Sequence, residues 1–194
     1  LVYLQKMKPT RKQEIIQVAA SLFKEKGYSA VSMRDIAQAM DIKAASLYNH
    51  ISGKQEILST LILEVAEAFT DKMSVITLEA LTPLQKIEKV IEIHIDITVN
   101  YSENIATLNN DWMHLEGDDL ERVVKMREDY EENFRSIIKQ GVAQGDIKPQ
   151  HPEVILFSIL STLRTLYLWN EKRGKMDVNV LKKDMVSVLI KGIA

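Results

Sequence analysis

Residues 32–51 read SMRDIAQAMDIKAASLYNHI, and this stretch predicts two short helices joined by a tight turn. Ser32 and Asp35 have the spacing of a capping box, in which each side chain accepts a hydrogen bond from the other residue's backbone N–H. We therefore expect the first helix to begin here. Four apolar residues then recur at helical spacing and give this helix one apolar face: Met33, Ile36, Ala37 and Met40.

The second half of the stretch predicts a helix that presents small and polar side chains to solvent. Ile42 points inward from the turn, and Leu47 and Ile51 face the core four residues apart. The outer face carries Ala44, Ala45, Ser46, Tyr48 and Asn49. Small residues beside polar ones allow close approach to the floor of a DNA groove, so the pattern predicts a helix-turn-helix. The alternative is a helical hairpin that only packs, because a bare helix-turn-helix pattern gives many false matches.

The segments on both sides of this stretch favour the DNA-binding interpretation. A helix opens at Thr10 and stops at Gly27, which we expect to supply a left-handed C-cap, and another helix begins after Gly53. The most informative residues are Ala19-Ala20-x-Leu22-Phe23, Gly27-Tyr28, Ser32-Met33-Arg34-Asp35-Ile36-Ala37, Ser46-Leu47-Tyr48-x-His50 and Lys54. Through them the first third of the chain closely resembles the N-terminal domain of the tetracycline-repressor (TetR) family of bacterial transcriptional regulators. The other two thirds resemble this family only in architecture.

The resemblance implies a set of DNA-contacting residues. Ser32 and Arg34 would hold a phosphate at the start of the first short helix, and Lys54 would meet the opposite flank of the groove. The complete set is Ser32, Arg34, Lys43, Ala44, Ala45, Ser46, Tyr48, Asn49, His50 and Lys54. Tyr28 is interpreted as a lid on the core. Residues 1–9 form an arm with two lysines that either contacts the phosphate backbone or is a solvated tail.

Three positions depart from the family pattern. Asp41 stands where the turn usually has Gly, and we expect the turn to be kept because Asp tolerates left-handed geometry better than most residues. Lys43 stands where a Ser or Thr N-cap is common, so the recognition helix lacks that cap. Ile51 replaces an aromatic residue and can still fill the core. These departures leave the operator sequence open.

The expected fold is all-α, with about nine helices in two domains. Residues 9–69 form the helix-turn-helix DNA-binding domain, with the motif itself at 32–51, and residues 70–194 form the ligand-binding and dimerisation domain. A helix from residue 152 to about 169 is apolar nearly all round, and the last helix carries a similar stripe. In this family such helices form a four-helix interface across a two-fold axis. A homodimer would then place two heads about 34–36 Å apart on the DNA.

The body is expected to bind a small-molecule effector that releases the DNA. The candidate lining residues are aromatic or charged side chains amid apolar helix faces: His94, Tyr101, Trp112, Met113, Arg127, Tyr130, Phe134, Arg164, Tyr167 and Trp169. Acyl-CoA-type regulators show a similar Arg-x-x-Tyr-x-x-x-Phe run, which suggests an acidic, partly apolar ligand. The alternatives are salt bridges from Arg127 and Arg164 to Glu131 or Glu171, a core role for His94, and core packing of the Trp112–Met113 pair.

Charge and composition agree with a DNA-binding regulator. Residues 1–54 carry nine Lys and Arg against four Asp and Glu, whereas the rest of the chain has a net negative charge. A basic head on an acidic body is expected where one end meets phosphate. The chain has no cysteine, no apolar run long enough to cross a bilayer and no signal sequence, which favours the cytoplasm.

Two other kinds of function compete with the repressor. An enzyme in the helical body lacks support, because no catalytic, phosphate-binding or metal-binding motif is present, and no cofactor is expected. The alternative to a metabolite-responsive repressor is a DNA-binding adaptor controlled by a protein partner, which the sequence does not exclude. A closed, fully packed body would favour the adaptor, and a cavity with Arg127 or Arg164 inside it would favour the repressor.

Overall fold

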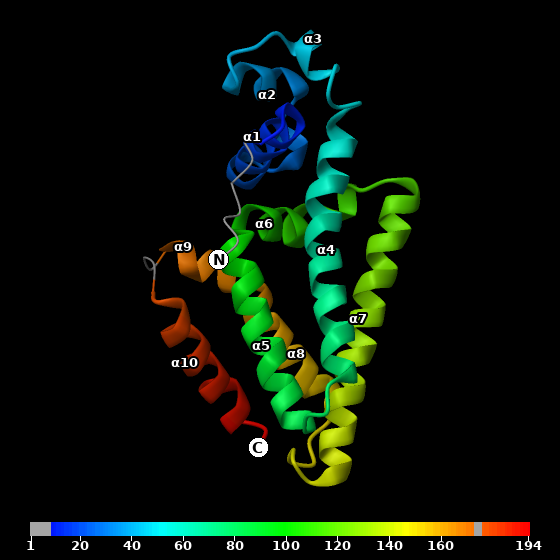
Figure 1. Cartoon of the computed structure of the whole chain (residues 1–194), viewed down its shortest axis with the longest axis vertical. Coiled ribbons are helices and arrows are strands. Elements are labelled where there is room, and N and C mark those ends of the chain that lie inside the picture. Colours follow the sequence, from blue (N-terminus) through cyan, green and yellow to red (C-terminus); the bar gives the residue numbers. More distant parts are fainter. Residues whose placement is uncertain (1–8, 173–175) are drawn as a thin grey trace, which may run out of the picture.

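The computed structural model describes residues 9–172 and 176–194, without the side chains of residues 170–172, and these residues are helical with no strand (Figure 1). Its helices are Arg11–Lys26 (α1), Met33–Ala39 (α2), Ala44–Leu47 (α3), Lys54–Leu78 (α4), Pro83–Asn100 (α5), Ser102–Asp111 (α6), Gly117–Gln144 (α7), Pro152–Arg164 (α8), Leu166–Lys172 (α9) and Val178–Lys191 (α10). Short 3-10 helices span Tyr28–Ala30 and Trp112–His114. The predicted all-α class with an N-terminal helix-turn-helix is confirmed.

The head consists of α1, α2 and α3 and sits at one end of the long helix α4 (Figure 1). The capping box that starts α2 is present: Asp35 N–H donates to Ser32 Oγ at 3.3 Å, and Ser32 N–H donates to Asp35 Oδ2 at 2.7 Å. A second capping box, between Thr10 and Gln13, starts α1. Asp41 has a φ of 53°, so this residue makes the left-handed turn that the sequence predicted for it.

The head has its own hydrophobic core, built where the three short helices meet the first half of α4. Leu47, Ile36 and Ile57 are fully shielded from solvent in this core. Leu115 and Val123 of the body join the same cluster. The head is therefore packed against the body as well as carried by α4.

In the body, α5 and α7 pack against α4, α8 packs against α7 and α5, and α10 packs against α5, while α6 crosses beneath the head (Figure 1). Along α4, Ile62 still belongs to the head core, whereas Met73 and Ile76 belong to the body core. The predicted domain boundary between residues 69 and 70 lies within this continuous helix. A rigid element thus runs from the head through the body.

Three local details differ from the sequence-based expectations. The helix expected from residue 152 to 169 is interrupted at Thr165, the C-cap of α8, so α8 and α9 are separate helices. Gly27 has a positive φ of 81° with a ψ of 148°, which is not the left-handed helical conformation expected. The recognition helix α3 ends at Leu47 instead of continuing to residue 51.

Candidate nucleic-acid interface and effector cavity

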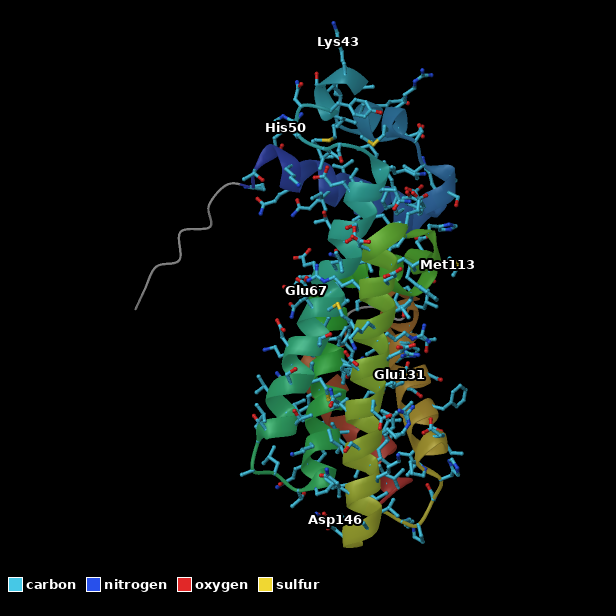
Figure 2. The ribbon with its side chains drawn as sticks, turned by 90° about the vertical axis from the view of Figure 1, so that its right-hand side faces the viewer. Lys43, His50, Glu67, Met113, Glu131 and Asp146 are labelled. Carbon is cyan, nitrogen blue, oxygen red and sulfur yellow. The ribbon has the colours of Figure 1, made fainter. Side chains whose placement is uncertain are left out.

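The predicted DNA-contacting residues gather at the free end of the head. Lys43 projects from its tip in Figure 2, with His50 on the same end of the molecule. Seven of the ten are solvent-exposed: Ser32, Arg34, Lys43, Ala45, Tyr48, Asn49 and His50. Ala44, Ser46 and Lys54 are half-buried. Leu47 and Ile51 face inward, so the core fixes the outer face of α3 as a surface of small and polar side chains.

Lys54 is turned toward the protein. Its ammonium group donates to the backbone carbonyls of Tyr28 and Val31, each at 2.9 Å, and lies 4.0 Å from the centre of the Tyr28 ring. Two of the three ammonium hydrogens therefore hold the segment that leads into α2. Its contact with DNA phosphate stays a prediction. Residues 1–8 of the predicted N-terminal arm lie outside the described residues.

A polar joint connects the head to the 3-10 helix between α6 and α7. Tyr28 N–H donates to Asp111 Oδ1 at 3.3 Å, and the Tyr28 ring stacks on His114 with centroids 5.4 Å apart. The Gln55 amide donates to the His114 carbonyl at 2.7 Å. Burial raises the pKa of the Asp111 carboxyl, and the hydrogen bond from Tyr28 opposes that rise. No local sequence signal indicates this joint, because Tyr28 lies 83 residues from Asp111 and Gln55 lies 59 residues from His114.

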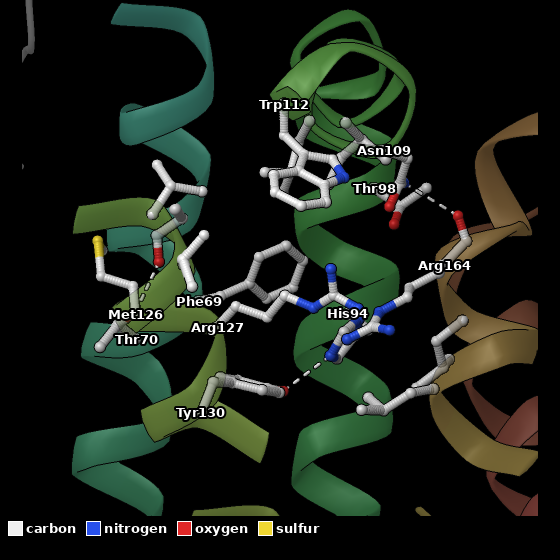
Figure 3. Close-up of a pocket in the computed structure, with 17 residues that line it drawn as sticks. Phe69, Thr70, His94, Thr98, Asn109, Trp112, Met126, Arg127, Tyr130 and Arg164 are labelled. Carbon is white, nitrogen blue, oxygen red and sulfur yellow. Dashed lines mark hydrogen bonds between the residues drawn. The ribbon is translucent and has the colours of Figure 1, made fainter. Parts of the chain in front are cut away.

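A cavity of about 310 Å³ lies in the body, between α4, α5, α6, α7 and α8 (Figure 3). Five of the predicted ligand-binding residues line it: His94, Trp112, Arg127, Tyr130 and Arg164. Sequence reasoning missed the other lining residues, which include Phe69, Thr70, Thr98, Asn109 and Met126. These side chains occupy helix positions that have the same periodicity as the core, so no sequence signal separated them from it.

The other candidates lie outside this cavity. Phe134 is fully buried in the body core, and the Tyr167 hydroxyl donates to Asn110 Oδ1 at 3.1 Å. Tyr101 caps α5 beside a surface groove that α1 and α6 border. Met113 and Trp169 are solvent-exposed.

A buried pair of polar side chains marks the inner wall of the cavity. His94 Nε2 and the Tyr130 hydroxyl share a hydrogen bond of 2.7 Å, drawn as a dashed line in Figure 3. Burial, assisted by the positive charge of Arg164, lowers the pKa of His94 to about 3. Burial likewise raises the pKa of Tyr130 above its ordinary value. Both groups are therefore neutral at physiological pH and offer the cavity hydrogen bonding without charge.

The charged groups of the cavity are two arginines that share one carboxylate. Arg164 donates to Glu131 Oε1 at 2.6 Å, and Arg127 Nε donates to the same oxygen at 3.3 Å. Arg127 also lies over the Trp112 ring, 5.7 Å from its centroid. The expected salt bridges to Glu131 are thus present, and both arginines line the cavity as well. The side chain of Glu171 lies outside the described residues.

Within the part of the chain that the structure describes, no group of three His, Asp or Glu side chains is arranged to hold a metal ion. None of the helices in residues 9–172 and 176–194 is long and apolar enough to span a membrane.

A helix-turn-helix head joined by one long helix to a body that contains a cavity defines the class of DNA-binding transcriptional regulators. Residues 80–193 match the family model for the tetracyclin repressor-like C-terminal domain, and residues 15–61 match the model for bacterial regulatory proteins of the tetR family. The chain therefore belongs to the tetracycline-repressor family of bacterial transcriptional regulators.

Individual relatives are distant in sequence and similar in structure. The HTH-type transcriptional repressor KstR2 of Rhodococcus jostii is 22% identical over 189 residues, which cover 96% of this chain and 93% of that repressor. The structure of the ketosteroid transcriptional regulator KstR2 of Mycobacterium tuberculosis superposes with a TM-score of 0.89 at 18% identity, over 97% of each chain. AibR in complex with isovaleryl coenzyme A and operator DNA gives a TM-score of 0.79 at 24% identity, over 93% of this chain and 98% of AibR.

Proposed function

We propose that this regulator is a homodimeric repressor that leaves its operator when a small acidic molecule with an apolar part occupies the body cavity. The observation that carries this proposal is the cavity itself, which combines apolar walls with Arg127 and Arg164. Trp112 lines the cavity and is flanked by Asp111 and His114, which contact the head. A ligand that moves Trp112 would therefore act directly on the joint between head and body.

The size of the cavity favours a compact effector. Its volume of about 310 Å³ lies at the lower end of the range of about 300–1,000 Å³ for ligand pockets. An acyl thioester with a short or branched acyl group would place that group against the apolar wall, and its charged carrier would stay near the arginines. The complex of AibR with isovaleryl coenzyme A supports this choice. The open cavity also favours a metabolite over a protein partner as the controlling signal.

The DNA-binding role rests on the exposed face of α3. Lys43 at the start of α3 and Arg34 on the neighbouring α2 supply positive charge, and Tyr48 at the end of α3, which is 55% exposed, supplies a hydroxyl group for phosphate or base contacts. Because phosphate binding releases counterions, affinity for the operator should fall steeply with salt. The proposed partner is double-stranded DNA, and the proposed location is therefore the cytoplasm.

Apolar side chains left on the surface of α8, α9 and α10 support the homodimer. Phe157 and Val188 are each 70% exposed, and Val154, Leu168 and Val180 are about half exposed. Exposed apolar residues in such numbers mark an interaction surface. Phe157→Asp should convert the dimer to a monomer in light scattering, while Leu78→Asp, at an exposed site on α4, should leave it a dimer. Dimers in both variants would contradict the α8 interface.

The effector proposal is tested by DNA-binding anisotropy on the region upstream of the protein's own gene. Isovaleryl-CoA should release the wild-type protein, and palmitoyl-CoA should act more weakly because its chain exceeds the cavity. Arg164→Ala should require about tenfold more isovaleryl-CoA, equivalent to about 1.4 kcal/mol of lost binding, with unchanged DNA affinity. Arg135→Ala is the matched control, since Arg135 pairs with Glu132 and Glu153 away from the cavity. Equal responses of both variants would refute the assignment of the cavity.

A further inference from the structure

Glu131 occupies an unusual position relative to the cavity. It is absent from the cavity wall, yet its carboxylate oxygen Oε1 contacts both arginines that belong to the wall. Arg127 reaches it from the same helix, α7, whereas Arg164 reaches it from α8. Figure 2 shows Glu131 about halfway along the body, on α7. One carboxylate thus pairs with both positive side chains without itself lining the cavity.

The charge balance at this site explains what the carboxylate can do. Burial would raise the pKa of Glu131, but hydrogen bonds and charge from Arg164 and Arg127 outweigh it and hold the pKa below its ordinary value. Glu131 is therefore ionised at neutral pH. His94 is neutral there, so the arginines are the charged side chains of the described wall and Glu131 is their counterion.

We propose that Glu131 is a built-in competitor for the anionic group of the effector, and that it determines which charge class of ligand the cavity accepts. An anion that approaches Arg127 and Arg164 must share their N–H donors with Glu131 or displace its carboxylate. Weakly binding anions are rejected, because their hydrogen bonds to the arginines would only replace those that Glu131 already accepts. A neutral ligand does not meet this competition. The inference rests on the proposed function, since it assigns specificity to the same cavity.

The competing anion has two chemical sources, a carboxylate of a free acid and a phosphate of a thioester carrier. Both present oxygen atoms that a guanidinium group binds through paired N–H donors. Three probes with one acyl chain separate them: hexanoate, hexanoyl-CoA and the neutral S-hexanoyl-pantetheine. Only the first two carry negative charge.

The test is isothermal titration calorimetry of each probe into the full-length wild-type protein and into Glu131→Gln. The variant keeps the size of the side chain and removes its charge. We expect it to bind an anionic probe about fivefold more tightly and the neutral probe unchanged. Glu132→Gln is the matched control, because it removes the adjacent charge, whose partner Arg135 lies outside the cavity wall. If Glu131→Gln does not fold, Glu131→Asp takes its place. Its shorter side chain moves the carboxylate away from the arginines, so anionic probes should again bind more tightly than they bind the wild type, with a smaller gain, and the neutral probe should bind unchanged.

Each outcome decides the question. A gain for hexanoate alone supports competition with a carboxylate, and a gain for hexanoyl-CoA alone supports competition with phosphate. Equal gains for all three probes would show that Glu131 acts by obstruction and would overturn the inference. Weaker anion binding would make Glu131 a positioning residue for the arginines, which also overturns it. If the wild type binds and Glu131→Gln binds equally, this inference alone falls; if neither protein binds any probe, the proposed effector class falls with it.

Discussion

The tip of the head presents its candidate functional side chains to solvent, whereas the cavity of the body presents its side chains to one another. At the tip, seven of the ten candidate DNA contacts lie on one short segment, residues 43–50, which Leu47 and Ile51 anchor to the core. In the cavity, the lining side chains come from five α-helices and a 3-10 helix and face one another. An outward surface can change without disturbing the fold, whereas a change in the cavity also changes the packing of the body.

One connection between the two regions lies at residues 111–114, next to the cavity. Asp111 and His114 contact Tyr28 of the head, and Trp112 between them lines the cavity. A four-residue segment therefore lies between the head, which carries the candidate DNA contacts, and the cavity. This arrangement lets the two functions be altered separately, and the following predictions test that separation.

The largest effect is expected from neighbouring residues of the recognition segment. Leu47 is fully buried, so Leu47→Ala should lower the free energy of unfolding by about 2–5 kcal/mol. Tyr48→Ala should change it by less than about 0.5 kcal/mol but weaken DNA binding about tenfold. Urea unfolding and DNA anisotropy measure the two effects. Loss of stability in Tyr48→Ala as large as in Leu47→Ala would break the contrast between surface and core.

The buried His94 should make the stability of the folded protein depend on pH. His94 has a pKa of about 3 in the folded protein and about 6.5 in the unfolded chain, so the unfolded state binds the proton first. Stability should therefore fall as the pH drops below about 6.5, by at most about 1.4 kcal/mol per pH unit. His94→Gln should abolish this fall between about pH 6.5 and 4.5, above the range where the carboxylates with lowered pKa values protonate.

Tyr130→Phe is the control for this measurement. It removes the hydrogen-bond partner of His94 but leaves the ring buried, and burial is the larger cause of the lowered pKa. The variant should keep most of the pH dependence in thermal unfolding. A wild-type protein whose stability stays constant between about pH 6.5 and 4.5 would contradict the neutral, buried histidine.

The smallest effect concerns Lys54 and separates its two possible roles. Because its ammonium group holds two carbonyls, Lys54→Met should lower the free energy of unfolding by about 1–3 kcal/mol. If the ammonium group also contacts a phosphate, the slope of log affinity against log salt should flatten by about one. Melting temperature and salt titration give both values. Unchanged stability together with a flatter slope would assign Lys54 to DNA alone.

Local signals in the sequence predicted much of the head. The capping boxes at Thr10 and Ser32 start helices where they were expected, and Asp41 takes the left-handed turn. Each of these features depends on residues within about four positions of one another, so short stretches of sequence contain all the necessary information. The end of α3 was misjudged, because the backbone leaves the helix after Leu47 while Ile51 still reaches the core.

The sequence by itself determined the all-α class, the helix-turn-helix, the family and the presence of unusual charges at Arg127 and Arg164. Only the tertiary structure decided that Phe134 and Tyr167 belong to the packed interior while Phe69 and Thr98 border a cavity. It also decided that Lys54 holds the turn before α2. The physical reason is that helical periodicity records which face of a helix is buried, whereas a cavity depends on how several buried faces fail to fill the space between them.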